Sequence, residues 1–371
     1  MSPDPRPLRK LGFLTIGLFD ETDPRRGHES TLELIGLGEQ LGFDSAWLRH
    51  RHLQYGISSP VAVLAAATQR TSRIELGTAV TPLGWENPLR LAEDLATVDV
   101  LSGGRLNPGF SVGPPTHYEH VRDALYPDTG AHEDFSPRRA ERLLALVRGE
   151  DASDVSGTEG IEVYSRRVQP HSPGLAARLW YGAGSLRSAR WAGEQGLNLL
   201  TSSVVKAETD GAGTNGAGTD ARVADGTGGG NRTDEGAFDF AAIQAAQIRA
   251  FRARHPDGER ARVSQGLVVI PTDSATPEQR AHYEAYALAR APRTLTPQGP
   301  ARLLFAPDLV GTSEELVEQL HAHAGYREVD EVAFALPFTF EHRDYVQILT
   351  DLATRLGPAL GWRPAPAPDG G

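Results

Sequence analysis

Short apolar runs alternate with longer amphipathic stretches along most of the chain. The apolar runs are rich in Val, Ile and Leu, as expected of parallel strands that are buried on both faces. The amphipathic stretches place apolar residues at helical spacing and carry helix start and stop signals. The predicted strands are 11–19, 43–49, 73–80, 105–113, 178–185, 196–202, 263–270 and 331–336, and the predicted helices are 29–41, 60–70, 87–102, 137–148, 186–195, 238–254, 277–290, 313–324 and 345–356. This alternation predicts an α/β fold.

The stretch 73–113 shows the pattern most clearly. Its first apolar run is followed by Asn87 and Pro88, which suit the N-cap and first position of a helix, and Gly103 suits the helix end. A second apolar run then begins at Arg105. A strand, a helix and a strand in this order predict parallel pairing with a right-handed crossover.

Composition narrows the class of protein. The 371 residues carry a net charge of −11 without a basic stripe, which argues against a nucleic-acid partner. The absence of cysteine excludes disulfides, thiolate nucleophiles and iron–sulfur ligation. The first ten residues lack an apolar signal core, and no later stretch has the length and hydropathy of a membrane span. We therefore expect a soluble, cytoplasmic protein with no membrane partner.

A Gly/Ser turn separates the strand at 178–185 from the helix after it. Gly184, Ser185 and Ser188 place small residues, hydroxyls and backbone N–H groups in a solvent-facing loop at a helix N-terminus. Such a terminus attracts anions, because its amides are unpaired and the helix dipole is positive there. An ordinary strand-to-helix connection is the alternative interpretation of the same residues.

His50, Arg51 and His52 follow the second predicted strand directly. Imidazoles at a strand end suit proton transfer, and a guanidinium suits an anion but cannot act as a base. The alternative is a solvated strand end. A metal site is disfavoured because no carboxylate with ligand spacing accompanies the histidines in the sequence, so we expect no metal.

Several short motifs together resemble the bacterial luciferase-like family of flavin-dependent oxidoreductases. They are Leu76-Gly-Thr-Ala-Val80, Asn87-Pro88, Ala92-Glu-Asp94 and Leu101-Ser-Gly-Gly-Arg105. The resemblance implies a TIM-type (β/α)8 barrel with insertions in the loops. Accordingly, we expect an N-terminal tail (1–10), a single barrel (11–362) and a C-terminal tail (363–371).

The composition of 206–236, with abundant Gly, Ala, Thr and Asp, predicts a flexible segment. It could link two domains, but the helix that should follow the sixth strand resumes at 238–254. A flexible insertion within one barrel is therefore the preferred interpretation.

The resemblance also implies where a flavin would bind. Its phosphate would lie on Gly184, Ser185 and Ser188, and its ring would lie against a cis peptide bond between Ala79 and Val80. Thr78, Ser111 and Gly113 are further candidates for the cofactor site. Some luciferases place a phosphate-binding arginine where this chain has Val112, so Arg187 is a possible substitute.

The function implied by the resemblance is that of a monooxygenase using reduced FMN (FMNH2) and molecular oxygen. A separate flavin reductase and a homodimer are possible partners. The alternatives are a reductase or dehydrogenase that uses the deazaflavin coenzyme F(420), and a flavin-binding protein without enzyme activity.

The candidate catalytic residues are His50, His52 and Arg51, although Arg51 occupies a position where family members often have histidine. His117, Tyr118 and Trp85 are candidates for contact with a small, mainly apolar organic substrate. Asp94 and Arg105 are the expected ion pair of the barrel.

Overall fold

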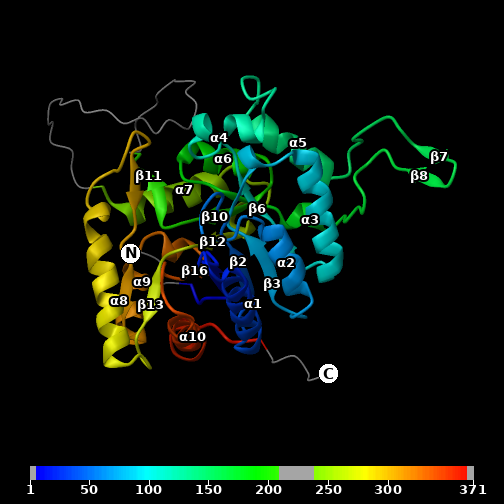
Figure 1. Ribbon diagram of the computed structural model, residues 1–371. Coiled ribbons are helices and arrows are strands. Elements are labelled where there is room, and N and C mark those ends of the chain that lie inside the picture. Colours follow the sequence, from blue (N-terminus) through cyan, green and yellow to red (C-terminus); the bar gives the residue numbers. More distant parts are fainter. Residues whose placement is uncertain (1–5, 209–237, 366–371) are drawn as a thin grey trace.

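The computed structural model describes residues 6–208 and 238–365 (Figure 1). Its central element is a parallel sheet in which two of the strands are each interrupted once. In chain order the strands are β1 (Lys10–Thr15), β2 (Ser45–Leu48), β3 with β4 (Glu75–Thr78 and Thr81–Pro82), β5 with β6 (Leu106–Asn107 and Gly109–Ser111), β9 (Trp180–Gly182), β10 (Asn198–Thr201), β12 (Val263–Gln265) and β16 (Glu331–Ala335). All eight runs predicted as strands contribute to this sheet.

The pairing closes the sheet into a ring. One path of parallel pairs runs from β5 through β3, β2, β1, β16, β12, β10 and β9 to β6, which pairs with β4. β3 and β4 are two parts of one strand, and β5 and β6 are two parts of the next strand. The path therefore begins and ends at the same two neighbouring strands, which closes the ring. The predicted TIM-type (β/α)8 barrel is confirmed.

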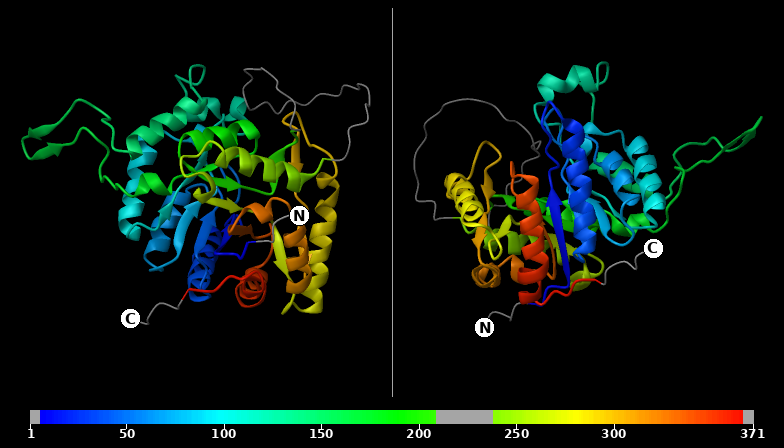
Figure 2. Two further views of the ribbon diagram at one scale, coloured as in Figure 1. Left: turned by 180° about the vertical axis from the view of Figure 1, so that it is seen from behind. Right: turned by 60° about the horizontal axis from the view of Figure 1, so that its bottom comes forward.

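Helices cover the outside of the barrel (Figures 1 and 2). They are α1 (Pro24–Gln40), α2 (Pro60–Thr68), α3 (Pro88–Ser102), α5 (Pro137–Val147), α6 (Leu186–Glu194), α7 (Phe240–Arg252), α9 (Ser313–Ala322) and α10 (His342–Asp351). Helix α3 has the predicted ends, since Asn87 accepts hydrogen bonds at its N-terminus and Gly103 adopts a left-handed conformation after it. Within the described ranges, none of the helices combines the length and apolar character that crossing a membrane requires.

Insertions lengthen several loops. They contain α4 (Tyr118–Leu125), a hairpin of β7 (Gly157–Glu159) and β8 (Glu162–Tyr164) that projects from the barrel, and α8 (Pro277–Arg290). Two small sheets pair β11 (Val204–Lys206) with β14 (Leu303–Phe305) and β13 (Val269–Pro271) with β15 (Leu309–Gly311). The expected flexible segment therefore begins with Lys206 in a strand, and its part from 209 to 236 lies outside the described residues.

The expected tails are partly packed against the barrel. Leu8 is buried, and its N–H donates to the carbonyl of Leu360 over 2.9 Å. Near the other end, the N–H of Ala365 donates to Gly42 over 3.2 Å. Lys10 already belongs to β1.

Two tryptophans fill the barrel interior. Trp47 on β2 and Trp180 on β9 are fully buried, and their ring centroids lie 5.4 Å apart in an edge-to-face arrangement. They form one cluster with Leu200, Ala333 and the partly buried Leu14, Ala79 and Val80. Residues from strands on opposite sides of the ring can meet only inside it, so this cluster is the interior core.

Charged side chains form a layer near the amino ends of the strands. Arg262 contacts Glu331 at 2.9 Å and Glu75 at 3.1 Å, and Lys10 contacts Glu75 at 2.6 Å. The Arg262 guanidinium also lies 4.7 Å from the ring centroid of Trp180. Three strands and the residue preceding β12 are thereby joined beneath the tryptophans.

The expected ion pair between Asp94 and Arg105 is wrong. Arg105 donates instead to the main-chain carbonyls of Ser102, Ile74 and Thr71. Asp94 contacts Arg90, which precedes it by one helical turn.

The buried ion pair in this region joins Asp99 on α3 to Arg178, with a closest distance of 2.7 Å. The Asp99 side chain is completely buried and also accepts hydrogen bonds from Ser172 and the Leu106 N–H. Both partners lie far apart in sequence, so helical spacing could not identify them.

A glycine pair tests the interior packing. A Cβ at Gly77 would lie 2.2 Å from the Trp47 ring, whereas a Cβ at Gly36 within α1 meets nothing within 4 Å. We expect Gly77→Ala to lower the free energy of unfolding by about 1 to 3 kcal/mol through overpacking. Gly36→Ala should raise it by about 0.5 to 1 kcal/mol, because alanine favours a helix interior. Denaturant titration measures both, and equal effects would contradict the packing described.

Candidate cofactor and active site

The peptide bond between Ala79 and Val80 is cis, as predicted. It separates β3 from β4, and both side chains contact the interior core. A Cβ at Gly182, on β9, would lie 2.7 Å from a methyl carbon of Val80, so this strand passes close to the Val80 side chain. This segment therefore lies inside the barrel mouth, where the carboxyl ends of the strands converge.

Thr78 is fully buried and ties two strands together. Its hydroxyl donates to the carbonyl of Gly109 over 2.7 Å and accepts from the Gly109 N–H over 2.9 Å. Through these bonds Thr78 has a structural role, because it links β3 to β6 beside the predicted cofactor site.

The loop before α6 is more enclosed than the sequence indicated. Ser185 is 7% exposed rather than solvent-facing, because its side chain caps the helix that follows. Its hydroxyl accepts from the Ser188 N–H over 3.2 Å, and the Ser185 N–H donates to the Ser188 hydroxyl over 3.1 Å. Gly184 has open space where a Cβ would stand. The three predicted residues thus form one capped helix N-terminus with room beside Gly184.

A carboxylate already binds at this helix N-terminus. The Leu186 N–H donates to Glu208 over 2.8 Å. Glu208 follows β11, in which the Lys206 N–H donates to the Gly184 carbonyl over 2.7 Å. An oxyanion held by a first-turn amide is the contact that a phosphate would make, so Glu208 shows the anion preference of this site directly.

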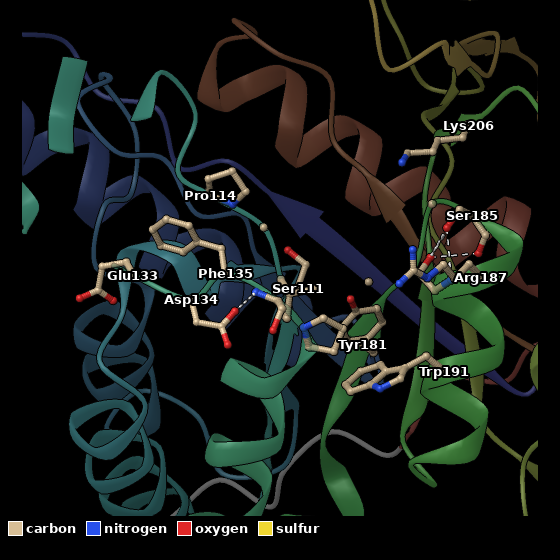
Figure 3. Close-up of a pocket in the computed structure, with 17 residues that line it drawn as sticks. Ser111, Pro114, Glu133, Asp134, Phe135, Tyr181, Ser185, Arg187, Trp191 and Lys206 are labelled. Carbon is tan, nitrogen blue, oxygen red and sulfur yellow. Dashed lines mark hydrogen bonds between the residues drawn. The ribbon is translucent and has the colours of Figure 1, made fainter. Parts of the chain in front are cut away.

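A cavity of about 680 Å³ opens beside this terminus (Figure 3). Arg187, Lys206 and Ser185 lie on one side of it, Phe135 and Asp134 on the other. Its lining also includes Ser111, Gly113, Gly184 and Ser188 from the predicted set, together with Tyr181 and Trp191. Two cationic side chains and a helix N-terminus at one end, with aromatic rings nearby, suit a molecule with a phosphate and an apolar body.

A second group of polar residues lies after β2. The ring centroids of His50 and His52 are 4.3 Å apart, and His52 stacks on Trp85 with a centroid distance of 4.0 Å. Glu86 completes the group, with an oxygen 4.0 Å from Nε2 of His50. His50 Nε2 also lies 2.6 Å from the carbonyl of Ser58 and so donates to it.

Burial controls the protonation of this group. It lowers the pKa of His50 to about 4, with the neighbouring His52 adding to the effect, and it also lowers the pKa of His52. Burial raises the pKa of Glu86 to about 7, and Asp94 adds to the rise. Near neutral pH both imidazoles are uncharged, and Glu86 is the residue that exchanges a proton.

The argument against a metal needs a correction. A carboxylate, Glu86, does accompany the two histidines, and one ligand atom from each residue lies within 4.8 Å of the others. However, His50 uses the nitrogen nearest Glu86 for its bond to Ser58. His50 Nδ1 and His52 Nε2 are buried without a hydrogen-bond partner in the described part of the chain. The raised pKa of Glu86 keeps part of its carboxyl protonated near neutral pH, which favours proton handling over metal binding.

The predicted substrate residues His117 and Tyr118 belong to the insertion that follows β6. His117 is exposed before α4, and the Tyr118 hydroxyl donates to the carbonyl of Gly130 over 2.6 Å. Tyr118 contacts Phe135, which lines the cavity. The structure thus associates Trp85 with the histidines and Tyr118 with the cavity.

Sequence reasoning missed Glu86 and Glu208. Glu86 directly follows Trp85, which had been singled out as a substrate residue, so its position was a usable signal. Glu208 stands within a stretch whose composition predicted a flexible segment, and no local signal pointed to a contact with α6.

Comparison with known proteins identifies the family. The model of the luciferase-like monooxygenase family matches residues 11–330. The chain therefore belongs to this family, as its motifs predicted.

The curated relatives include enzymes of two cofactor types. The chain is 27% identical over 198 residues to an alkanal monooxygenase alpha chain of Photobacterium leiognathi, which covers 50% of this chain and 53% of the relative. It is 31% identical over 180 residues to an F420-dependent glucose-6-phosphate dehydrogenase of Intrasporangium calvum, covering 44% and 51%. The matches to these relatives thus span about half of their length.

Solved structures support the fold. The oxygenating constituent of 3,6-diketocamphane monooxygenase from Pseudomonas putida, in complex with FMN, gives a TM-score of 0.62 at 14% identity, covering 95% of this chain and 99% of that one. The coenzyme F420-dependent tetrahydromethanopterin reductase from Methanopyrus kandleri gives 0.57 at 16% identity, covering 96% and 100%.

The first site prediction concerns Glu86→Gln. The unfolded carboxyl loses its proton near pH 4.5 and the folded one near pH 7, so wild-type stability should fall between these values. The variant cannot ionise and should gain about 2 to 3 kcal/mol over wild type as the pH rises from 4.5 to 7. Denaturant titrations at pH 5 and pH 8 measure the difference. Glu21→Gln, at an exposed position, is the control, and a difference independent of pH would refute the raised pKa.

The second site prediction concerns Glu208→Gln. This change removes a negative charge that competes with a phosphate for the Leu186 N–H. We expect FMN to bind about fivefold more tightly, since a helix-terminus charge contributes about 1 kcal/mol. Fluorescence titration measures the affinity. Glu194→Gln, at the other end of α6, is the matched control and should leave the affinity unchanged.

Proposed function

We propose that the protein is a flavin-dependent monooxygenase that uses reduced FMN and molecular oxygen to oxidise a small organic substrate. The observation that carries the proposal is the N-terminus of α6, where the Leu186 N–H donates to the carboxylate of Glu208 beside a cavity lined by Arg187 and Lys206. Membership of the luciferase-like monooxygenase family supports it. So do relatives named as alkanal monooxygenase and, over a shorter match, limonene 1,2-monooxygenase of Rhodococcus erythropolis.

The residues present fit such a cofactor. Gly184, Ser185 and Ser188 with Arg187 would hold its phosphate, and Ala79 with Val80 would support its ring. When bound, the reduced flavin supplies the electrons that activate oxygen. The chain supplies the binding site, the orientation of the ring and the exclusion of water.

The buried histidines and Glu86 would manage protons. The side chain of His50 is 1% exposed and that of Glu86 is 29% exposed, so Glu86 can exchange protons with solvent. Its carboxyl lies 4.0 Å from the nearest His50 nitrogen. With its pKa raised to about 7, Glu86 would be the proton donor, and the nitrogens without a partner among the described residues, Nδ1 of His50 and Nε2 of His52, would relay or orient the proton.

A deazaflavin enzyme using coenzyme F(420) is the second candidate. Relatives and structures named as F420-dependent support it, and the phosphate site at α6 suits either cofactor. Titration with FMN and with F(420), each in oxidised and reduced form, distinguishes the two. Binding of neither would also remove the third possibility, a flavin-binding protein without activity. The flavin reductase, the homodimer and the cytoplasmic location stay predictions.

Turnover tests the proton assignment. We expect His50→Asn and His52→Asn to bind cofactor normally but to slow turnover by about 10²- to 10⁴-fold, the range for a lost acid or base. The rate of the wild type should fall as the pH rises past about 7, because Glu86 then loses its proton. Glu86→Gln should abolish this dependence. The pH range in which the rate changes is thus set by Glu86. An imidazole with an unperturbed pKa would titrate in a similar range, but burial lowers the pKa of His50 to about 4.

Rates within tenfold of wild type for both histidine variants would overturn the assignment. Glu21→Gln serves again as the control, since Glu21 is exposed. Cofactor affinity measured on the same variants separates a chemical defect from a binding defect.

A further inference from the structure

Arg49, His50, Arg51 and His52 divide their side chains between two surroundings. The two histidines meet Trp85 and Glu86, which follow β4. The two arginines instead meet Phe338, which follows β16. Alternate side chains of this segment thus lie in different surroundings, and the four residues serve two sites.

The second site has three arginines around one aromatic ring. The guanidinium carbons of Arg49, Arg51 and Arg290 lie 5.8, 5.9 and 5.3 Å from the centroid of Phe338. Arg290 closes α8, and Arg293 follows it in the next turn. The long insertion between β12 and β16 thus brings cations to the end of β2.

The acidic side chains described at this site do not neutralise all of its arginines. Asp308 pairs with Arg290 and lies 3.8 Å from Arg293. The side chains of Arg49 and Arg51 have no hydrogen bond or ion pair to any residue in 6–208 or 238–365. Two guanidinium groups therefore remain without a counter-charge.

This arrangement is costly for the protein alone. Burial lowers the pKa of Arg49 to about 10, and repulsion from Arg51, Arg290 and Arg293 adds to the effect. Burial also lowers the pKa of Arg51. Both side chains are partly buried, and a partly buried cation without a partner lowers stability, so an anion that binds here would recover that cost.

The site is separate from the α6 terminus. Following the ring of paired strands, β1 lies between β2 and β16, and β9 is the strand opposite to β1. The arginines lie above β2 and β16, whereas α6 follows β9. A cofactor phosphate at α6 therefore leaves Arg49 and Arg51 on the other side of the barrel mouth.

We propose that Arg49 and Arg51 bind the carboxylate of an organic acid substrate, with Phe338 contacting its apolar part. This inference rests on the proposed function and narrows its substrate to a molecule with one anionic end. Each guanidinium offers parallel N–H groups that match a carboxylate, which an ammonium could not do. The anion would be held by the chain segment that also carries His50 and His52, on the side that faces Phe338.

Binding of matched probes tests the proposal. Calorimetric titration compares benzoate with benzamide and hexanoate with hexanamide, with and without FMN, at constant ionic strength. We expect the acids to bind and their uncharged amides not to bind. Arg49→Met and Arg51→Gln should each weaken acid binding at least tenfold and leave FMN affinity unchanged. Arg25→Gln, an exposed arginine on α1, should change neither.

Thermal unfolding provides an independent readout. Without any ligand, Arg49→Met should raise the melting temperature by about 2 °C, because it removes an uncompensated, partly buried charge. A lower melting temperature would mean that Arg49 is a structural residue, and equal binding of acid and amide would mean that no anion site exists. Either result overturns the inference.

The titrations in the presence of FMN distinguish failure of this inference from failure of the proposed function. Competition between benzoate and FMN would show that the arginines hold the cofactor, and the substrate inference would then be wrong. If FMN fails to bind while benzoate still binds through Arg49 and Arg51, the proposed function fails and the anion site stands.

Discussion

A closed ring of strands needs a filled interior, and the edge-to-face pair of Trp47 and Trp180 packs there with Leu200 and Ala333. The pair requires an absent side chain at Gly77, because a Cβ there would overlap the Trp47 ring. Trp180 is fixed from the side by its indole N–H, which donates to Asn107 over 3.1 Å. Ala79 and Val80 rest on the same cluster. The segment expected to support a flavin ring is therefore held by the packing that closes the barrel.

Arg262 is paired with acidic residues at one end of the barrel, but Arg49 at the other end is not, among the described residues. Near the amino ends of the strands, Arg262 contacts two carboxylates and a tryptophan face, so its charge is compensated. Near the carboxyl ends, Arg49 has three arginine neighbours and no acidic partner among the described residues. A compensated charge stabilises the closed ring, whereas an uncompensated one is costly unless a ligand supplies the missing anion. The charges near the amino ends of the strands therefore stabilise the barrel, whereas we infer that those near the carboxyl ends bind an anionic ligand.

The sequence predicted the fold well because its signals are local. Eight apolar runs, the cap at Asn87 and the stop at Gly103 each follow from residues close together in the chain. Long-range pairs were not accessible in the same way. The ion pair of Asp99 with Arg178 and the contact of Leu186 with Glu208 join residues whose separation no periodicity encodes. The family motifs placed the cis bond correctly, but they gave no information on side chains particular to this protein, such as Glu86 and Arg49.

One short segment after β2 links the two halves of the candidate active site. Its even-numbered residues, His50 and His52, lie beside a carboxyl whose pKa depends on burial, with Asp94 raising it and Arg139 opposing. Its odd-numbered residues, Arg49 and Arg51, face Phe338 and α8. The arginines are not among the groups that set the protonation of Glu86. An anion bound at the arginines would thus be held at the same strand end as the proton-handling group but by different side chains, so that substitutions can test binding and proton transfer separately.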